Sequence, residues 1–267
     1  MKLVVKVGGS LLKDGVSEVI LDDLARQAGS DQLVLVHGGG DLVTEIARKL
    51  GKEQRFIMSP QGIRSRFTDK ETAGIYTMVM SGMISKTLTA ALATRGTRAV
   101  SLSGLDGSLI LAKRKKRLVA VDPRGRKIFI DGGYTGRVEK VNSELIEMLL
   151  AGGYVPLISP VAIGEEGESL NIDGDRVAAS VALAIGAHTI VFLTNVRGLT
   201  MDGRLVEKAS VAEVRALLPS IGFGMQKKVM AAVESVEGGV AEAIICSGTV
   251  QNPVNAGLDH ANCTVIS

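Results

Sequence analysis

The sequence is poor in several residue types, and each shortage excludes a class of protein. Its 267 residues include two cysteines, three histidines and no tryptophan, and only 3% are aromatic. Cys246 and Cys263 are too few for a disulfide framework, and with so few histidines we expect no metal site built from protein ligands. Because many nucleic-acid-binding proteins stack bases on aromatic rings, the composition also argues against nucleic-acid binding.

Long hydrophobic runs are missing as well. The longest nearly apolar stretch, the 11 residues 177–187, is shorter than the roughly 18 that a membrane helix needs. The first apolar run begins at Leu3 and is too short for a signal peptide, so we expect a cytoplasmic protein without a membrane segment. A hydrophobic fraction of 46% and a net charge of only +3 exclude intrinsic disorder.

The sequence is rich in glycine, with 32 residues. It also alternates between two hydrophobic patterns. Short β-branched runs alternate with amphipathic stretches of helical period, which predicts βαβ units around a mainly parallel sheet. The expected strands are 3–7, 32–36, 99–102, 155–158, 189–193 and 243–246. The expected helices are 19–28, 42–50, 70–80, 83–95, 143–151, 176–185 and 227–237. The expected helix N-caps are Asp41, Asp69 and Asn142, and the expected stops are Gly51, Gly96 and Gly152.

Two segments interrupt this alternation. Residues 109–121 and 127–130 flank a turn with Pro123 and Gly125, which predicts a β-hairpin projecting from the α/β body. A smaller hairpin is expected between residues 199 and 206. Because no internal repeat or Pro-rich linker divides the chain, we expect a single domain over residues 1–267.

Glycine clusters stand where the first two strands should end. Residues 6–10 read Lys-Val-Gly-Gly-Ser, and residues 37–41 read His-Gly-Gly-Gly-Asp. Backbone N–H groups in such loops attract anions, although two tight turns would also use glycine. Neither cluster fits a Walker or dinucleotide-binding pattern, which disfavours a P-loop ATPase and a Rossmann dehydrogenase.

Charged and amide side chains add to this picture. Arg64 and Arg66 could bind a carboxylate, although either alone could be solvated surface charge. Asn171, Asp173 and Asp175 alternate along the chain and could converge on a cleft, or they could form a capping turn. Lysines at 227 and 228 open a helix against its macrodipole, which indicates a functional demand.

Taken in order, these segments resemble the amino acid kinase family, specifically its acetylglutamate-kinase-like branch. The residues that carry the resemblance are 6–10, 37–40, 66–69, 170–175 and 224–228, with support from 136–142 and 193–199. The resemblance covers essentially the whole chain. It implies a three-layer αβα sandwich with a mainly parallel central sheet, and transfer of the ATP γ-phosphoryl group, with Mg²⁺, to a side-chain carboxylate. It further implies an acceptor-binding lobe over about 1–160 and an ATP-binding lobe over about 161–267.

The resemblance also implies a role for each matching position. The catalytic residues would be Lys6 and Lys228, which neutralise the moving phosphoryl group, and Asp175, which orients them. The acceptor would be held by Gly39, Gly40, Arg66 and Asn171. The nucleotide would be bordered by Gly8, Gly9, Ser10, Thr194 and Asn195.

Within this branch, residues 59–69 and 102–107 are similar to the subgroup of kinases that act on 2-aminoadipate or glutamate carried by the small acidic protein LysW, in lysine and arginine biosynthesis. Residues 113–127 hold eight Lys or Arg and one acidic residue, and such a concentration of positive charge attracts an acidic partner. The expected carrier-docking residues are Lys113, Arg114, Lys115, Lys116 and Arg117. The other interpretation is that the basic hairpin is simply exposed to solvent.

Two further functions stay open at this point. A free N-acetylglutamate kinase of arginine biosynthesis would use the same chemistry without a carrier. A catalytically inactive amino-acid or nucleotide sensor would be expected to lack Lys6, Asp175 or Lys228, and all three are present. Because the chain starts directly at its first strand, without the extra helix of hexameric relatives, we expect a homodimer.

Overall fold

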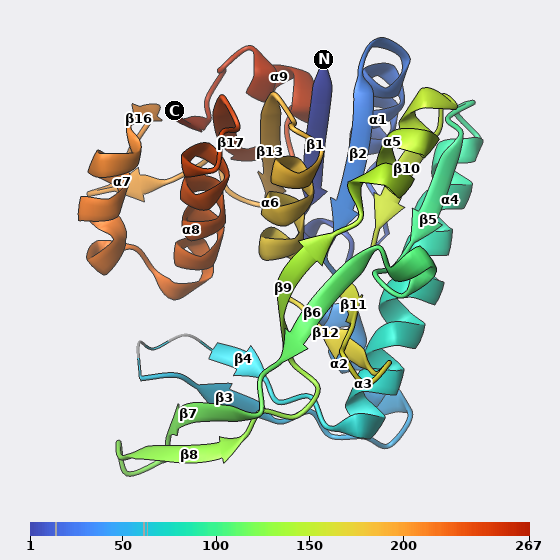
Figure 1. Ribbon diagram of the computed structural model, residues 1–267. Helices are drawn as coiled ribbons and strands as arrows, with labels where there is room; N and C mark the ends of the chain where they lie inside the picture. The colour runs from blue at the N-terminus through green and yellow to red at the C-terminus, as the bar shows by residue number, and fades with distance from the viewer. Residues whose placement is uncertain (14, 61, 63) are drawn as a thin grey trace.

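One large sheet organises the protein. The computed structural model describes residues 1–13, 15–60, 62 and 64–267; Gln61 and Ile63 of the 59–69 motif lie outside the described residues. In the described chain this sheet has eight strands in the order β16-β18-β17-β13-β1-β2-β10-β5 (Figure 1). Their bounds are Lys208–Ala209, Thr264–Ile266, Glu242–Ser247, Thr189–Thr194, Lys2–Val7, Gln32–His37, Val155–Ile158 and Ala99–Leu102. Only β17 and β18 pair antiparallel, so the predicted mainly parallel α/β fold is confirmed.

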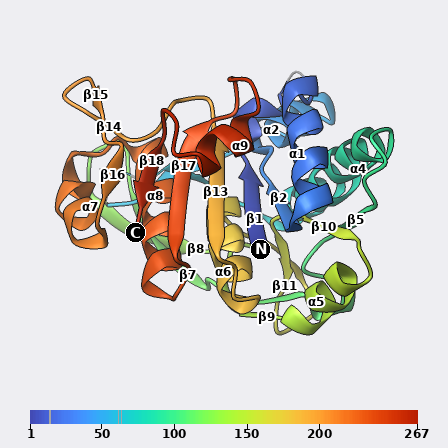
Figure 2. The same cartoon turned by 90° about the horizontal axis from the view of Figure 1, so that it is seen from above.

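Helices cover both faces of this sheet (Figure 2). Leu3 and Val5 of β1 pack into one core, and Val4 between them packs into the other, as expected for a strand buried on both sides. The first core includes residues of α1 Glu18–Ser30, α2 Gly40–Lys49, α3 Lys70–Thr77, α4 Ser85–Ala93 and α9 Pro253–Leu258. The second includes residues of α5 Ser143–Ala151, α6 Gly174–Ala184, α7 Val211–Leu217 and α8 Phe223–Glu237. In the described part of the chain, no helix is long and apolar enough to cross a membrane.

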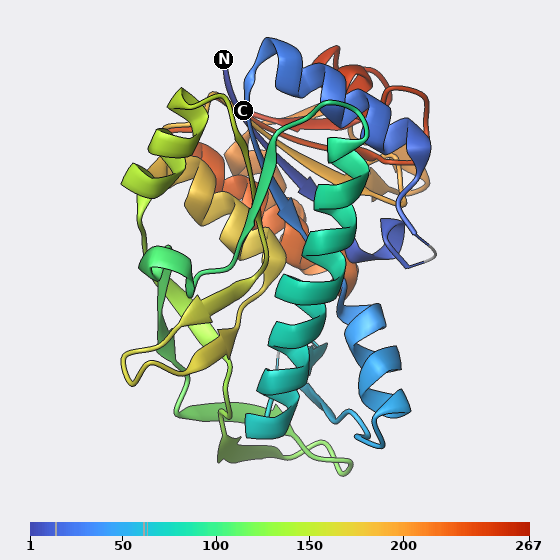
Figure 3. The ribbon, with the colours of Figure 1, turned by 90° about the vertical axis from the view of Figure 1, so that its right-hand side faces the viewer.

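The two helices expected around Gly82 are one long helix, so the predicted break is wrong. A π-helical turn, Met78–Ile84, joins α3 to α4 without interruption (Figure 3). The Ser85 hydroxyl donates to the Met80 carbonyl at 3.0 Å and helps to satisfy the backbone there. Such turns occur often at functional sites, and this one places Ile84 against the glycine loop after β2.

The predicted helix starts are partly right. Asp69 caps α3, accepting a hydrogen bond from Thr72 N at 2.8 Å. Asp41 is not a cap, because α2 begins one residue earlier, directly after Gly39, whose φ of +150° suits glycine alone. Asn142 occupies the N-cap position of α5, but its side chain makes no capping bond.

The projecting hairpin is confirmed, but its first arm is bent. The segment 109–121 divides into β6 Ile110–Arg114 and β7 Arg117–Val121, which pair with β9 Gly136–Val141 and β8 Lys127–Asp131. The bend lies beside Gly132, which packs so closely on Lys115 that a Cβ there would overlap the Lys115 carbonyl. The smaller hairpin, β14 Thr200–Met201 with β15 Arg204–Leu205, forms as predicted.

Small sheets lie beyond the carboxyl ends of β1 and β2 (Figure 1). Strands β11 Val161–Ile163 and β12 Ser169–Asn171 join β6 and β9 in a four-stranded sheet. Strands β3 Phe56–Met58 and β4 Arg64–Arg66 form a separate pair. In open α/β sheets, ligands bind at the carboxyl ends of the strands, so the space between the large sheet and these small ones is the expected site.

Candidate active site

The two glycine loops meet because the strands that precede them are parallel neighbours. Val7 of β1 is in register with His37 of β2, and Gly38 N donates to Val7 O at 2.9 Å. A Cβ on Gly9 would lie 2.6 Å from Gly39 N, and a Cβ on Gly39 would lie 2.1 Å from Ile84 Cδ1. Glycine is therefore required for the backbones to approach this closely, and Gly9, Gly39 and Gly40 all line a cavity of about 820 Å³.

A buried carboxylate joins two lysines beside this cavity; Asp175 and Lys6 line the cavity, whereas Lys228 does not. Asp175 Oδ1 lies 2.8 Å from Lys6 Nζ and 3.0 Å from Lys228 Nζ, and each of the three residues is less than 10% exposed. Burial by itself would raise the pKa of Asp175, but the two ammonium groups outweigh it and hold that pKa well below its usual range. Burial, reinforced by Lys6, lowers the pKa of Lys228. The arrangement places two cations side by side with one negative charge between them.

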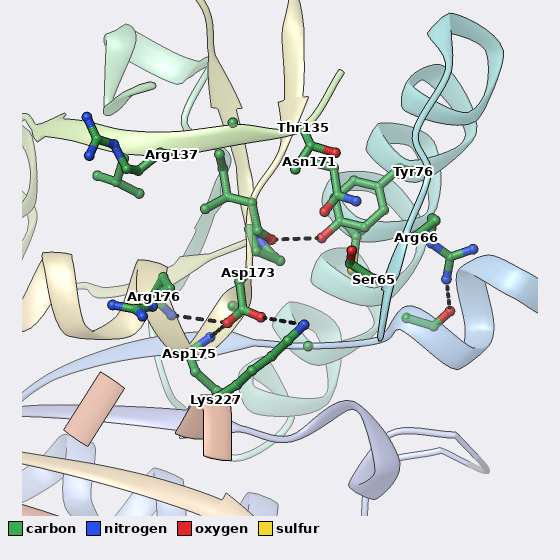
Figure 4. Close-up of a pocket in the computed structure, with 18 of the residues that line it drawn as sticks. Ser65, Arg66, Tyr76, Thr135, Arg137, Asn171, Asp173, Asp175, Arg176 and Lys227 are labelled. Carbon is green, nitrogen blue, oxygen red and sulfur yellow. Dashed lines mark hydrogen bonds and ion pairs between the residues drawn. The ribbon is translucent and has the colours of Figure 1, made fainter. Parts of the chain in front are cut away.

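Arg66 closes the opposite end of the cavity. Its Nη2 donates to Gly40 O at 2.6 Å and to Thr44 Oγ1 at 2.9 Å, and its Nη1 donates to Gln54 Oε1. Figure 4 shows Arg66 with one of these bonds. Burial lowers the pKa of Arg66, which stays far above neutrality for a guanidinium group. These bonds hold the side chain in one orientation beside the glycine loop. A cation fixed in this way can bind a carboxylate.

Asn171 and Asp173 face the same cavity, as their alternation predicted. Asn171 Nδ2 donates to Thr68 Oγ1 at 2.9 Å. Asp173 caps α6, accepting from Asp175 N at 3.0 Å, and lies 3.6 Å from Lys227 Nζ. The N-cap thereby positions Asp175 in the first turn of the helix, where it reaches Lys6 and Lys228.

Lys227 links two distant parts of the chain. From α8 its ammonium group donates to the carbonyl of Arg64 on β4 at 3.3 Å while it faces Asp173. The two lysines at the end of the 224–228 motif were the sequence signal for Lys227. The sequence alone did not indicate which residues its side chain contacts. Thr135, Arg137 and Tyr76 also line the cavity and were not singled out from the sequence.

The expected nucleotide residues lie beside the cavity rather than in it, apart from Gly9. Gly8 N donates to Leu193 O at 3.0 Å, which holds the first glycine loop against the end of β13. Thr194 and Asn195 follow that strand, and Ser10 lies in the short turn after β1. These residues gather on the β13 side of the lysine pair.

The side chains of the basic segment 113–117 lie in several different surroundings. Arg114 turns inward, donating to Gly133 O at 2.7 Å and stacking 4.2 Å above Tyr134. Lys115 lines the main cavity. Lys113, Arg114 and Lys116 border a second hollow of about 640 Å³ together with acidic residues Asp131, Glu165, Glu166 and Glu168. The bend between β6 and β7 causes this division.

The donor set of the site suits a polyanion more than a bare metal ion. The described residues contain no group of three His, Cys, Asp or Glu side chains placed to hold a cation. Lys6, Lys228 and the N–H group of Gly9 are instead suited to phosphate oxygens. A divalent cation there would depend largely on oxygens that a nucleotide brings with it.

Comparison with known proteins agrees with this geometry. The sequence pattern of the amino acid kinase family matches residues 1–247. The chain therefore belongs to the amino acid kinase family. A solved structure, smu.665 from Streptococcus mutans, superimposes with a TM-score of 0.79 over 100% of this chain and 98% of the other at 23% identity, which shows a shared fold.

Two curated relatives are similar to this chain over nearly its full length. The chain is 53% identical over 264 residues to a protein of Cenarchaeum symbiosum, covering 99% of this chain and 98% of the relative. It is 44% identical over 265 residues to a protein of Saccharolobus islandicus, with the same coverage. Both relatives are named LysW-aminoadipate/LysW-glutamate kinase, the first as a provisional assignment.

Proposed function

We propose that this protein phosphorylates the side-chain carboxylate of 2-aminoadipate, glutamate or both while the amino acid is carried by LysW, as a cytoplasmic enzyme of lysine and arginine biosynthesis. The observation that carries the proposal is the buried Lys6–Asp175–Lys228 cluster, whose Lys6 and Asp175 line the same cavity as Arg66. The names of the curated relatives support the choice of substrate.

Each residue of the cluster has a part in phosphoryl transfer. Lys6 and Lys228 neutralise charge on the transferred group, which is where such enzymes obtain most of their rate. Asp175 holds both ammonium groups in place. The acceptor carboxylate is ionised at neutral pH, so the reaction needs no general base. Mg²⁺, when bound with ATP, would supply further charge neutralisation at the phosphates.

The two substrates would approach from different sides of the lysine pair. The acceptor occupies the cavity against Gly39, Gly40, Arg66 and Asn171, in a lobe made mainly by residues 1–160. ATP lies along Gly8, Gly9, Ser10, Thr194 and Asn195, mainly in the lobe from 161 onward. The two polyanions then meet only at the two lysines.

The basic surroundings of the cavity support a carrier-linked substrate. Lys115 and Leu118, at the base of the β7–β8 arm, line the cavity, so a chain leaving the acceptor site would pass along this arm. Lys116 and Arg117 are exposed there and suited to an acidic carrier. A free N-acetylglutamate kinase remains the alternative enzyme. An inactive sensor would not need the buried lysine pair.

The experiment that tests the proposal traps acyl phosphate with hydroxylamine in the presence of ATP and Mg²⁺. Three acceptors are compared: LysW-linked 2-aminoadipate, LysW-linked glutamate and free N-acetylglutamate. We expect hydroxamate only from the carrier-linked acceptors, with the Lys6→Ala variant as the inactive control. Equal or faster reaction of free N-acetylglutamate would assign the alternative activity.

We also propose a homodimer. The long helix formed by α3, the π turn and α4 exposes about half of the Met78 and Met83 side chains, which supports an apolar contact between two copies. Light scattering coupled to gel filtration should give twice the mass of the 28.0 kDa chain. A hexamer or a monomer would contradict this assignment.

A further inference from the structure

One wall of the cavity carries hydrogen-bond donors that the proposed reaction does not use. Thr135 directly precedes β9, and Arg137 is the second residue of that strand; both side chains line the cavity. Lys115 lies beside them, because its backbone N–H donates to Thr135 O at 2.9 Å. All three line the cavity, and we call them the β9 wall. Figure 4 shows Thr135 and Arg137 across the cavity from Asp175 and Lys227.

The polar groups of the β9 wall lack partners within the described residues. Thr135 Oγ1 is buried without a hydrogen bond. The side chains of Lys115 and Arg137 make no ion pair or hydrogen bond there, although burial and neighbouring cations lower the pKa of Lys115. A buried hydroxyl without a partner is unfavourable and rare in native proteins. The polar groups of the β9 wall are therefore available to bind a ligand.

Three other cations of the cavity are already paired with carboxylates. Lys6 pairs with Asp175, Lys227 with Asp173, and Arg176 with Glu234. Arg64 stacks on the Phe56 ring, with its guanidinium carbon 3.9 Å from the ring centroid. In total, seven Lys or Arg but only three Asp or Glu line the cavity. The excess positive charge includes Arg66 beside the Gly40 loop and Lys115 and Arg137 on the β9 wall, so the cavity is suited to an acceptor with more than one negative group.

We propose that the β9 wall binds a second carboxylate, located on the carrier side of the bond that joins the amino acid to its carrier. Two cationic donors and a hydroxyl match the oxygens of a carboxylate. The wall lies across the cavity from the lysine pair, and Lys115 adjoins the β7–β8 arm where the carrier is proposed to pass. This inference rests on the proposed function and adds a specificity subsite to it.

Two synthetic probes test the subsite without requiring turnover. N-succinyl-2-aminoadipate carries the additional carboxylate, and N-succinamoyl-2-aminoadipate replaces it with a neutral amide of the same size. Calorimetry should show wild-type protein binding the first about tenfold or more tightly than the second, because a charge-assisted hydrogen bond is lost. Lys115→Gln and Arg137→Gln should each reduce this preference to within about twofold. Thr135→Val should reduce it less.

Lys140→Gln is the matched control, because Lys140 is exposed on the same strand and does not line the cavity. It should keep the full preference. Equal binding of the two probes by wild-type protein, no binding of either, or an unchanged preference in both cavity variants would overturn the inference. A raised KM for ATP in Arg137→Gln with the preference intact would assign the wall to the nucleotide instead. Failure of the proposed function is separate, since it appears as absence of hydroxamate from every carrier-linked acceptor.

Discussion

At the Lys6 end of the cavity the charged groups are buried and paired with one another, whereas at the β9 wall they are more exposed and lack partners. Lys6 and Asp175 stand on the large sheet and on α6, which two hydrophobic cores support. Arg137 stands on β9 of the four-stranded sheet, and Lys115 lies in the bend between β6 and β7. The buried cluster suits charge neutralisation in the proposed phosphoryl transfer, and the small sheets suit the recognition of a particular acceptor.

The largest effect on activity should come from removing either lysine of the buried cluster. Lys228→Ala or Lys6→Ala should lower kcat about a thousandfold or more while changing both KM values only a few-fold, because these lysines bind the transition state better than the ground state. Asp175 keeps one lysine in either variant, so the fold should survive. Steady-state kinetics measure the effect, with Lys140→Ala as an exposed control. A change confined to KM would refute the role.

His37 offers a second test of burial at this end. The ring is fully buried, with Nε2 2.8 Å from Ser85 Oγ, and desolvation lowers its pKa to about 4. As the pH falls, the His37 imidazole takes up a proton in the unfolded chain before it does so in the folded protein. Its contribution to stability is therefore complete above about pH 6.5 and is lost progressively as the pH falls to about 4. The loss amounts to about 3 kcal/mol. Urea unfolding between pH 7.5 and 4 should show a steeper decline for wild type than for His37→Gln, and identical slopes would contradict the assignment.

A variant of Arg66 tests the acceptor end of the cavity, and it should affect only the binding of the acceptor. Arg66→Ala should raise the KM for the acceptor about 10- to 100-fold, the usual cost of losing a charged hydrogen-bond donor, and leave the KM for ATP unchanged. Arg48→Ala, an exposed position on α2, is the matched control. An unchanged acceptor KM would show that Arg66 only braces the Gly40 loop through its hydrogen bonds to Gly40 O and Thr44 Oγ1.

The smallest effect should come from the exposed carrier surface. Lys116→Gln combined with Arg117→Gln should raise the KM for a LysW-linked acceptor about threefold at low salt, because exposed charge pairs contribute little. The difference should vanish at high ionic strength as the charges are screened. Lys49→Gln combined with Lys140→Gln controls for net charge. Equal salt dependence in both double variants would assign the effect to overall charge.

Much of the fold was predictable because its strands are buried on both faces. Six runs such as 3–7 and 189–193 are continuous and β-branched, and their observed bounds differ by a residue or less at each end. The glycine motifs and the alternation of Asn171, Asp173 and Asp175 also indicated the cavity. The helix break at Gly82 was wrong, because a π turn can carry a helix through such a position when packing against Gly39 favours it.

The sequence by itself determined the family, the mainly parallel sheet and the residue types needed for phosphoryl transfer, because these depend on local periodicity and short motifs. Only the tertiary structure decided which charges meet. It placed Asp175 between Lys6 and Lys228, and it divided the basic run so that Lys115 faces the cavity beside Arg137. Residues far apart in the chain come together when strands pair and a sheet bends, and no local pattern records either event.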